Sequence, residues 1–271
     1  MIRVELVKML RRPRTWIVIA MLNALPTLVA VLLAVTDIGP KPGEGPAFLS
    51  AVLTDGTLFP LAALAIVLPL FMPVAVAVVA GDAIAGEAQE GTLRYVLVRP
   101  VGRTTLLVAK LVSVVAFVLL SVLVVAAFGY VVGLTLLGQA EATGGVTGLS
   151  GSSLTSQQII ERTLMSVGYV TLSMLGVAGL ALLLSTLTDS PLGAALGALA
   201  FLIASTLLLT LDAAAALQPY LPTRYWLAFV DLFRDPILWR DLVRGVLLQG
   251  AYLSVFLGAA WANFATKDIT S

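Results

Sequence analysis

Six long runs of apolar residues, separated by shorter polar stretches, dominate the chain. They cover residues 15–36, 57–80, 106–137, 159–187, 191–211 and 243–264. A helix rises about 1.5 Å per residue, so about 20 apolar residues cross the roughly 30 Å hydrocarbon core of a bilayer. The pattern predicts an all-α membrane protein with six transmembrane helices in a single transmembrane domain, residues 1–271. The third and fourth runs are longer than one bilayer needs, and we expect these helices to tilt or to project beyond the lipid.

The first apolar run follows a basic segment, a combination that also begins secretory signal peptides. The run has about 20 residues, whereas the apolar region of a signal peptide has about 7–15. No small-residue cleavage site ends the run, so we expect an uncleaved span. Residues 2–12 place apolar side chains on one helical face: Ile2, Leu6, Met9 and Leu10. This predicts an N-terminal interfacial helix whose cations face anionic lipid, ended by Pro13. The alternative is a basic flank that only orients the first span.

Prolines and glycines mark special positions within the spans. Pro60, Pro69 and Pro73 lie in the second run. Each removes a backbone donor and can kink the helix, or can merely shape its packing. Two small-xxx-small pairs, Gly129–Gly133 and Gly193–Gly197, allow close helix contact, within the chain or across a dimer.

Composition narrows the function classes. The chain is 59% hydrophobic and 11% charged, and its mean hydropathy is +1.03. A chain with so little charge does not suit an ordinary cytosolic enzyme or a disordered protein. It contains no Cys and no His, which excludes disulfides, thiolate and imidazole catalysis, and metal sites built on these ligands. A net charge of +1 does not suggest nucleic-acid binding.

Lys and Arg near the span ends predict the orientation. With a cytoplasmic N-terminus, ten of the sixteen Lys and Arg residues lie inside and six lie outside. The bias is moderate, and it predicts a multi-pass protein of the cytoplasmic (inner) membrane with both termini cytoplasmic.

Two outer loops differ in character. Residues 139–157 are rich in Gly, Ser and Thr and predict a flexible connector. Residues 212–242 form the outer loop between the fifth and sixth spans, and six of the twenty aromatic residues fall within 220–239. Tyr225, Trp226, Phe229 and Phe233 share a helical face, which predicts a short helix at the outer interface, either as a membrane anchor or as a lid over an exit path.

The inner loop, residues 81–105, carries the strongest signal. It holds three acidic residues and three Arg between two apolar spans. Gly91 interrupts one helical stretch, Thr92 can cap the next, and Pro100 ends it. These residues predict either a short amphipathic helix that docks on another protein or a solvated turn.

This loop resembles that of the permease family of ABC-2 type ABC transporters. The resemblance rests on a Gly-Glu-x-x-x-Gly-Thr-Leu run and an Arg-Pro-x-x-Arg end, here Gly86, Glu87, Glu90, Gly91, Thr92, Leu93, Arg99, Pro100 and Arg103. The basic N-terminal helix, the six spans and the aromatic outer loop extend it over nearly the whole chain.

The resemblance implies a cytoplasmic coupling helix between spans 2 and 3 that docks on a separate ABC ATP-binding subunit. The expected interface comprises Gly86, Glu87, Glu90, Gly91, Thr92, Leu93, Arg94, Tyr95, Arg99, Pro100 and Arg103. Two ATP-binding subunits and two permeases, the second permease expected to be identical, would form an exporter. The chain has no P-loop, so it is not expected to be an enzyme or to bind a cofactor, and ATP and Mg would be held by the partner.

Two other functions stay open. An ion-coupled secondary transporter usually needs an ionisable residue near the membrane midplane, whereas Lys110, Glu161, Arg162 and Asp189 are expected near span ends. A non-catalytic membrane scaffold is the other alternative. The sequence assigns no catalytic, metal or substrate residue; polar side chains in the spans are few, which favours an apolar or amphipathic cargo.

Overall fold

The computed structural model describes residues 1–36, 55–91, 102–138, 146–150 and 152–266. Its long helices are α1 (Ile2–Arg11), α2 (Pro13–Val35), α4 (Phe59–Val67), α5 (Phe71–Gln89), α7 (Arg103–Val132), α8 (Ser156–Leu187), α9 (Pro191–Leu209) and α10 (Trp239–Thr266). Short helical turns are η1 (Gly56–Leu58), the π-helical η2 (Gly133–Leu137), η3 (Asp212–Ala214), η4 (Gln218–Tyr220) and η5 (Trp226–Phe233). Strands β1 (Val146–Thr147) and β2 (Ser153–Leu154) pair antiparallel. Within these described ranges, six helices are long and apolar enough to cross a membrane, which confirms the helical class with six apolar helices of spanning length.

The second span is interrupted. The run predicted over 57–80 forms α4, a turn at residues 68–70, and α5. Pro69 lacks the N–H that would bond to the carbonyl of Ala65, and Pro73 lacks the N–H that would bond to the carbonyl of Pro69, so both prolines weaken the same turn. The predicted kink is thus a break, and α5 continues to Gln89. The loop predicted over 81–105 is correspondingly shorter, because its first nine residues belong to α5 and Arg103 already begins α7.

Local capping explains where two other spans, α8 and α9, begin. Thr155 accepts a hydrogen bond from the backbone N–H of Gln158, whose side chain in turn accepts from the backbone N–H of Thr155, and this capping box starts α8. Ser190 caps α9 in the same position, followed by Pro191 at the first helical residue.

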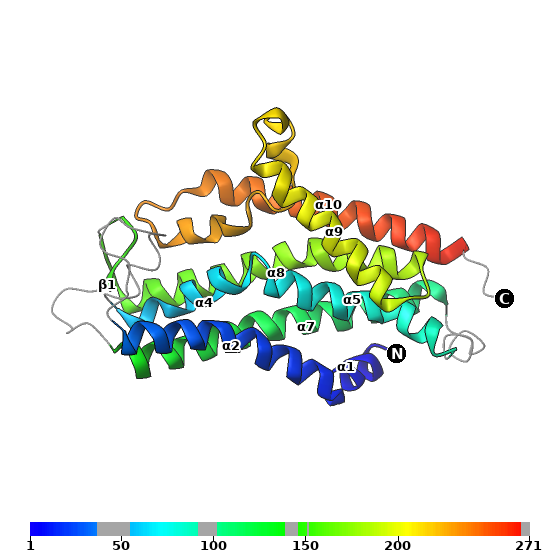
Figure 1. Cartoon of the computed structure of the whole chain (residues 1–271), viewed down its shortest axis with the longest axis horizontal. Coiled ribbons are helices and arrows are strands. Elements are labelled where there is room, and N and C mark those ends of the chain that lie inside the picture. The colour runs from blue at the N-terminus through cyan, green and yellow to red at the C-terminus, as the bar shows by residue number, and fades with distance from the viewer. Residues whose placement is uncertain (37–54, 92–101, 139–145, 151, 267–271) are drawn as a thin grey trace.

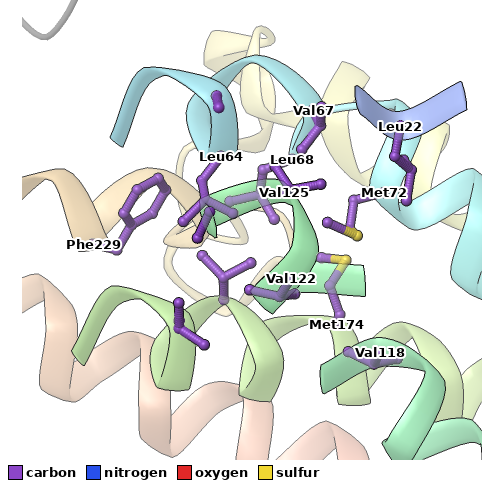
Figure 2. Packing of buried hydrophobic residues seen from close by; sticks show 14 of the residues in the cluster. Leu22, Leu64, Val67, Leu68, Met72, Val118, Val122, Val125, Met174 and Phe229 are labelled. Atoms are coloured by element: carbon purple, nitrogen blue, oxygen red, sulfur yellow. The ribbon is translucent and has the colours of Figure 1, made fainter. Parts of the chain in front are cut away.

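Helices α4, α5, α7 and α8 enclose the core. Figure 2 shows Leu64 and Leu68 beside Val125 of α7. Met72 of α5 and Met174 of α8 lie close together in the same view, and both are fully buried. The helix α8 packs against α5, α7, α9 and α10 and is therefore the central helix of the bundle.

The predicted close contact at Gly129 and Gly133 occurs within the chain. A Cβ at position 129 would lie 3.0 Å from the Cβ of Ala63 in α4. A Cβ at position 133 would collide with the carbonyl of Gly56 and with Phe59. These glycines let α7 approach η1 and α4 closely. Of the second pair, Gly197 packs on Leu184 of α8, whereas Gly193 is exposed.

The outer loop, 212–242, corrects one prediction. Its short helix exists as η5, but Trp226, Phe229 and Phe233 are buried against α8 and α10 instead of anchoring the chain in the interface. Tyr220 and Trp239, 67% and 55% exposed, are the aromatic side chains that remain available to lipid headgroups. The connector predicted over 139–157 contains the β1–β2 hairpin, and Leu149 N–H donates to the carbonyl of Phe233, so the hairpin closes over the end of η5.

The N-terminus and the last turn of α10 lie at one end of the bundle, and β1 lies at the other (Figure 1). The first end also holds α1, the last turn of α5 and the first turn of α7 (Figure 1). We call it the α1 end. The candidate site lies there.

Candidate functional site

Four charged side chains meet at the α1 end, and we call them the ionic quartet: Glu5, Lys8, Glu87 and Lys110. Lys110 Nζ lies 2.9 Å from Glu5 Oε2 and 2.5 Å from Glu87 Oε1. Lys8 Nζ lies 2.7 Å from the same Glu87 oxygen. The quartet therefore connects α1, α5 and α7 through alternating charges.

The corner between α1 and α2 turns Glu5 and Lys8 toward the bundle. Arg12 is extended between the two helices, and Pro13 begins α2. The Thr15 hydroxyl donates to the carbonyl of Met9 (2.7 Å), and Trp16 Nε1 donates to the carbonyl of Leu10 (2.8 Å). These bonds cap the carbonyls that the end of α1 leaves without helical partners. As a result α1 packs along α7, with Met9 buried.

Two arginines share one carboxylate beside the quartet. Arg12 Nη1 lies 3.1 Å and Arg14 Nη1 3.8 Å from Asp82 Oδ2 of α5. A Cβ at Gly86 would collide with the carboxylate of Asp82, so the glycine leaves the room that this side chain occupies. The predicted interfacial helix is confirmed as a helix. Two of its cations, Lys8 and Arg12, form ion pairs with carboxylates of α5, a contact that the prediction of lipid-facing cations did not include.

An open pocket of about 200 Å³ lies between α1, α2, α5 and α7. The quartet and the Arg12–Asp82 pair line one part of it. Apolar residues of α2 and α5, among them Ile17, Val18, Val78 and Val79, line the rest. The pocket is therefore amphipathic.

Hydrogen bonds to neighbouring helices fix both stems of the α5–α7 loop. The Ser185 hydroxyl of α8 donates to the carbonyl of Gly81 (2.7 Å) and accepts from the N–H groups of Ile84 and Ala85 (3.1 and 2.9 Å). At the other stem, Arg103 Nη1 donates to the carbonyl of Ala265 at the end of α10 (3.0 Å). The end of α5 is thus bound to α8, and the start of α7 to α10.

The predicted interface residues divide into three groups. Thr92, Leu93, Arg94, Tyr95, Arg99 and Pro100 lie outside the described residues. Glu90 is exposed at the end of α5 and lines the pocket. Gly91 ends α5 with a φ of 68°, a conformation that favours glycine, and its N–H donates to the carbonyl of Ala88.

The third group is a correction to the predicted docking surface. Glu87 is buried, only 6% exposed, and its carboxylate faces Lys8 and Lys110 inside the bundle. Gly86 is buried beside Asp82, and Arg103 reaches back to α10. Gly86 and Glu87 therefore do not form an exposed contact, whereas Arg103 is half-buried and bound to α10.

Sequence reasoning missed the quartet. Lys110 lies near a span end, as predicted, but it is 4% exposed and bound to two carboxylates, which the sequence did not indicate. The available signal was a pair of opposite charges, Glu87 and Lys110, at the facing ends of consecutive apolar runs. Isolated charges there are costly unless they are paired.

The arrangement supports binding and mechanical linkage. Among the described residues, no group of three His, Cys, Asp or Glu side chains is placed to hold a metal ion. The quartet consists of close charge pairs, which hold helices in place and do not resemble an activated nucleophile.

Comparison with known proteins identifies a family whose description assigns no function. The model of the family described as "Protein of unknown function (DUF2705)" matches residues 45–270. The matched range includes both stems of the α5–α7 loop, whereas α1 and α2 precede it. No curated protein matches the chain.

Proposed function

The chain belongs to the DUF2705 family, and we propose that it is the membrane-spanning permease subunit of an ATP-driven ABC transporter, an exporter. A separate ATP-binding subunit supplies the hydrolysis, and its closure moves the loop between α5 and α7. The spans respond by alternating between inward-open and outward-open packing. In this proposal two permease copies and two ATP-binding subunits form the transporter in the cytoplasmic membrane, with both termini cytoplasmic.

The observation that carries the proposal is the attachment of both loop stems. A loop that transmits force must be joined firmly to the helices that it moves. Ser185 binds three backbone groups of α5, and Arg103 binds the last turn of α10. The quartet adds a link from α5 to α7 and α1. A displacement of the loop would therefore reach α5, α7, α8 and α10 together.

The loop motif and the lack of a P-loop in this chain support a nucleotide-binding partner. The loop resembles that of ABC-2 permeases, and the chain has no P-loop of its own. Since Glu87 is buried, the proposed contact surface consists of Glu90 and the residues that follow, with Leu93 and Tyr95 as apolar contacts and the arginines setting the register.

Purification from the native membrane tests the proposal. The tagged full chain is extracted in mild detergent, and the eluate is assayed for ATP hydrolysis. The proposal expects a co-eluting P-loop protein whose turnover vanadate inhibits. A single band without ATPase activity, obtained after cross-linking in the membrane, would contradict it.

Loop variants test the assigned surface. The single variants Glu90→Lys and Leu93→Asp are expected to insert normally but to lose the ATP-binding subunit. Each should reduce co-purified ATPase activity at least about tenfold, because one central interface contact is worth about 2 kcal/mol or more. Glu161→Lys is the matched control, since Glu161 is an exposed glutamate in the first turns of α8, away from the loop. Normal ATPase recovery with both loop variants would remove these residues from the interface.

The ionic quartet gives the ion-coupled alternative its one supporting observation. Ionisable side chains buried in membrane helices often serve ion pathways. Glu87 lies two residues before the end of α5, however, and Lys110 seven residues after the start of α7, so the quartet is near the helix ends. Uptake driven by a proton gradient without ATP would favour this alternative.

A further inference from the structure

Two arginine side chains lie together at the mouth of the pocket between α1, α2, α5 and α7. Arg12 and Arg14 have side chains 36% and 69% exposed, and both face the single carboxylate of Asp82. One carboxylate neutralises only one of the two guanidinium groups. Each guanidinium presents five donors, so most of these N–H groups remain available to a second anion.

The ionic quartet does not supply that anion. Its two lysines and two glutamates balance one another, and the buried Lys110 is held by Glu5 and Glu87. Glu90 also lines the pocket, at the exposed end of α5. Its side chain contributes one negative charge to the rim, but it forms no ion pair with Arg12 or Arg14 among the interactions within the described ranges.

The opposite wall of the pocket is apolar and open to the membrane. Ile17 of α2 and Val78 of α5 are 57% and 45% exposed. Val18 and Val79 lie beside them in the lining. Both helices are long and apolar enough to cross the bilayer, so this wall faces lipid chains while the arginines lie at the helix end.

We propose that this pocket binds the headgroup phosphate of an anionic phospholipid. Arg12 and Arg14 hold the phosphate oxygens by charge-assisted hydrogen bonds, and the acyl chains lie along Ile17 and Val78. The apolar wall favours a phospholipid over free phosphate, because a phospholipid can place its phosphate at the arginines while its chains stay beside the wall in the bilayer, whereas free phosphate contacts the arginines alone. Glu90 borders both this pocket and the proposed ATPase contact, but Arg12 and Arg14 are not part of that contact, and the lipid site does not depend on the transporter function.

Lipid retention tests the site directly. The full chain is reconstituted in phosphatidylcholine nanodiscs with increasing fractions of phosphatidylglycerol, then released and examined by native mass spectrometry. We expect about one retained phosphatidylglycerol per chain and no comparable retention of phosphatidylcholine. The Arg12→Gln/Arg14→Gln variant should lower retention at least about tenfold, since each lost charge-assisted hydrogen bond is worth a factor of about ten.

A matched variant separates the pocket from general surface charge. Arg3 and Arg11 are exposed on α1 and do not line the pocket, so Arg3→Gln/Arg11→Gln removes the same charge from the same region. The proposal requires this variant to retain more lipid than Arg12→Gln/Arg14→Gln. Equal losses in the two variants would overturn the proposal in favour of unspecific attraction to the membrane surface.

A gain-of-binding variant covers the case in which the double arginine variant folds poorly. Asp82→Asn removes the competing carboxylate while keeping its shape, and should increase retention of phosphatidylglycerol severalfold. Unchanged or reduced retention would contradict the assigned role of the two arginines. Displacement of the lipid by millimolar inorganic phosphate would show a phosphate site that does not need the apolar wall, and would likewise overturn a lipid site.

Discussion

Replacement of Lys110 by Met tests whether the ionic quartet holds the α1 end together. The Lys110 side chain is 5% exposed and is bound to Glu5 and Glu87, which are 12% and 7% exposed. Its removal leaves two carboxylates close together with little access to water. Breaking a buried ion pair by removing one partner costs about 3–5 kcal/mol. For a chain of this size that corresponds to a fall in melting temperature of roughly 10 °C.

Lys8 provides the matched control, because it binds the same oxygen of Glu87 from the solvent side. Its side chain is 39% exposed, so water screens the interaction. Lys8→Met should therefore cost no more than about 1 kcal/mol. Combining Lys110→Met with Glu87→Gln should recover part of the loss, since the second change removes one of the two carboxylates that Lys110 faced.

Thermal unfolding of the full chain in detergent, followed by tryptophan fluorescence, measures all four proteins. The reasoning requires a much larger shift for Lys110→Met than for Lys8→Met, and a partial recovery in the double variant. Equal shifts in melting temperature for the two lysine variants would mean that burial does not determine how much these ion pairs stabilise the chain. No recovery with Glu87→Gln would mean that the two side chains do not interact as the structure has them.

Two further predictions concern glycines, measured by the same unfolding assay. Gly91→Ala should destabilise the chain by about 1 kcal/mol, because position 91 has a φ of 68° that alanine adopts at a cost. Gly133→Ala should cost about 1–3 kcal/mol, since the added Cβ collides with the carbonyl of Gly56 and must push α7 away. Gly250→Ala is the control for both: its Cβ meets nothing within 4 Å, and alanine suits a helix interior better than glycine, so it should be neutral or stabilising. A Gly133→Ala protein that melts like Gly250→Ala would refute the close contact.

The sequence predicted the spans well because the signal is local. A run of about 20 apolar residues has few alternatives to a membrane helix, and each of the six predicted runs overlaps one of the candidate spans in the described part of the chain, although the second span is shifted to Phe71–Gln89. The α1–α2 corner followed from Pro13, and the interruption of the second span from Pro69 and Pro73, whose missing N–H groups act on the nearest turn.

The candidate site could not be predicted in the same way, because it depends on contacts between distant residues. Glu87 belongs to a motif whose spacing does not reveal which side of the helix faces inward. Its partner Lys110 is 23 positions away, and Lys110 in turn lies 105 positions from Glu5. The aromatic face of η5 shows the same limit: its helical spacing was correct, but an apolar face can cover protein as well as lipid, and here it covers α8.

The interruption of the second span divides the bundle into two packing groups. Helix α4 packs mainly on α7, whereas α5 packs mainly on α8 and α9. An unbroken helix of this length would move as one rigid rod, and a tilt at one end would displace the other. With the turn at residues 68–70, a tilt of α5 can end at mid-depth and leave the contact between α4 and α7 in place. The interrupted span therefore lets α5 tilt at the α1 end while α4 keeps its place at the opposite end of the bundle, where the β1–β2 hairpin lies.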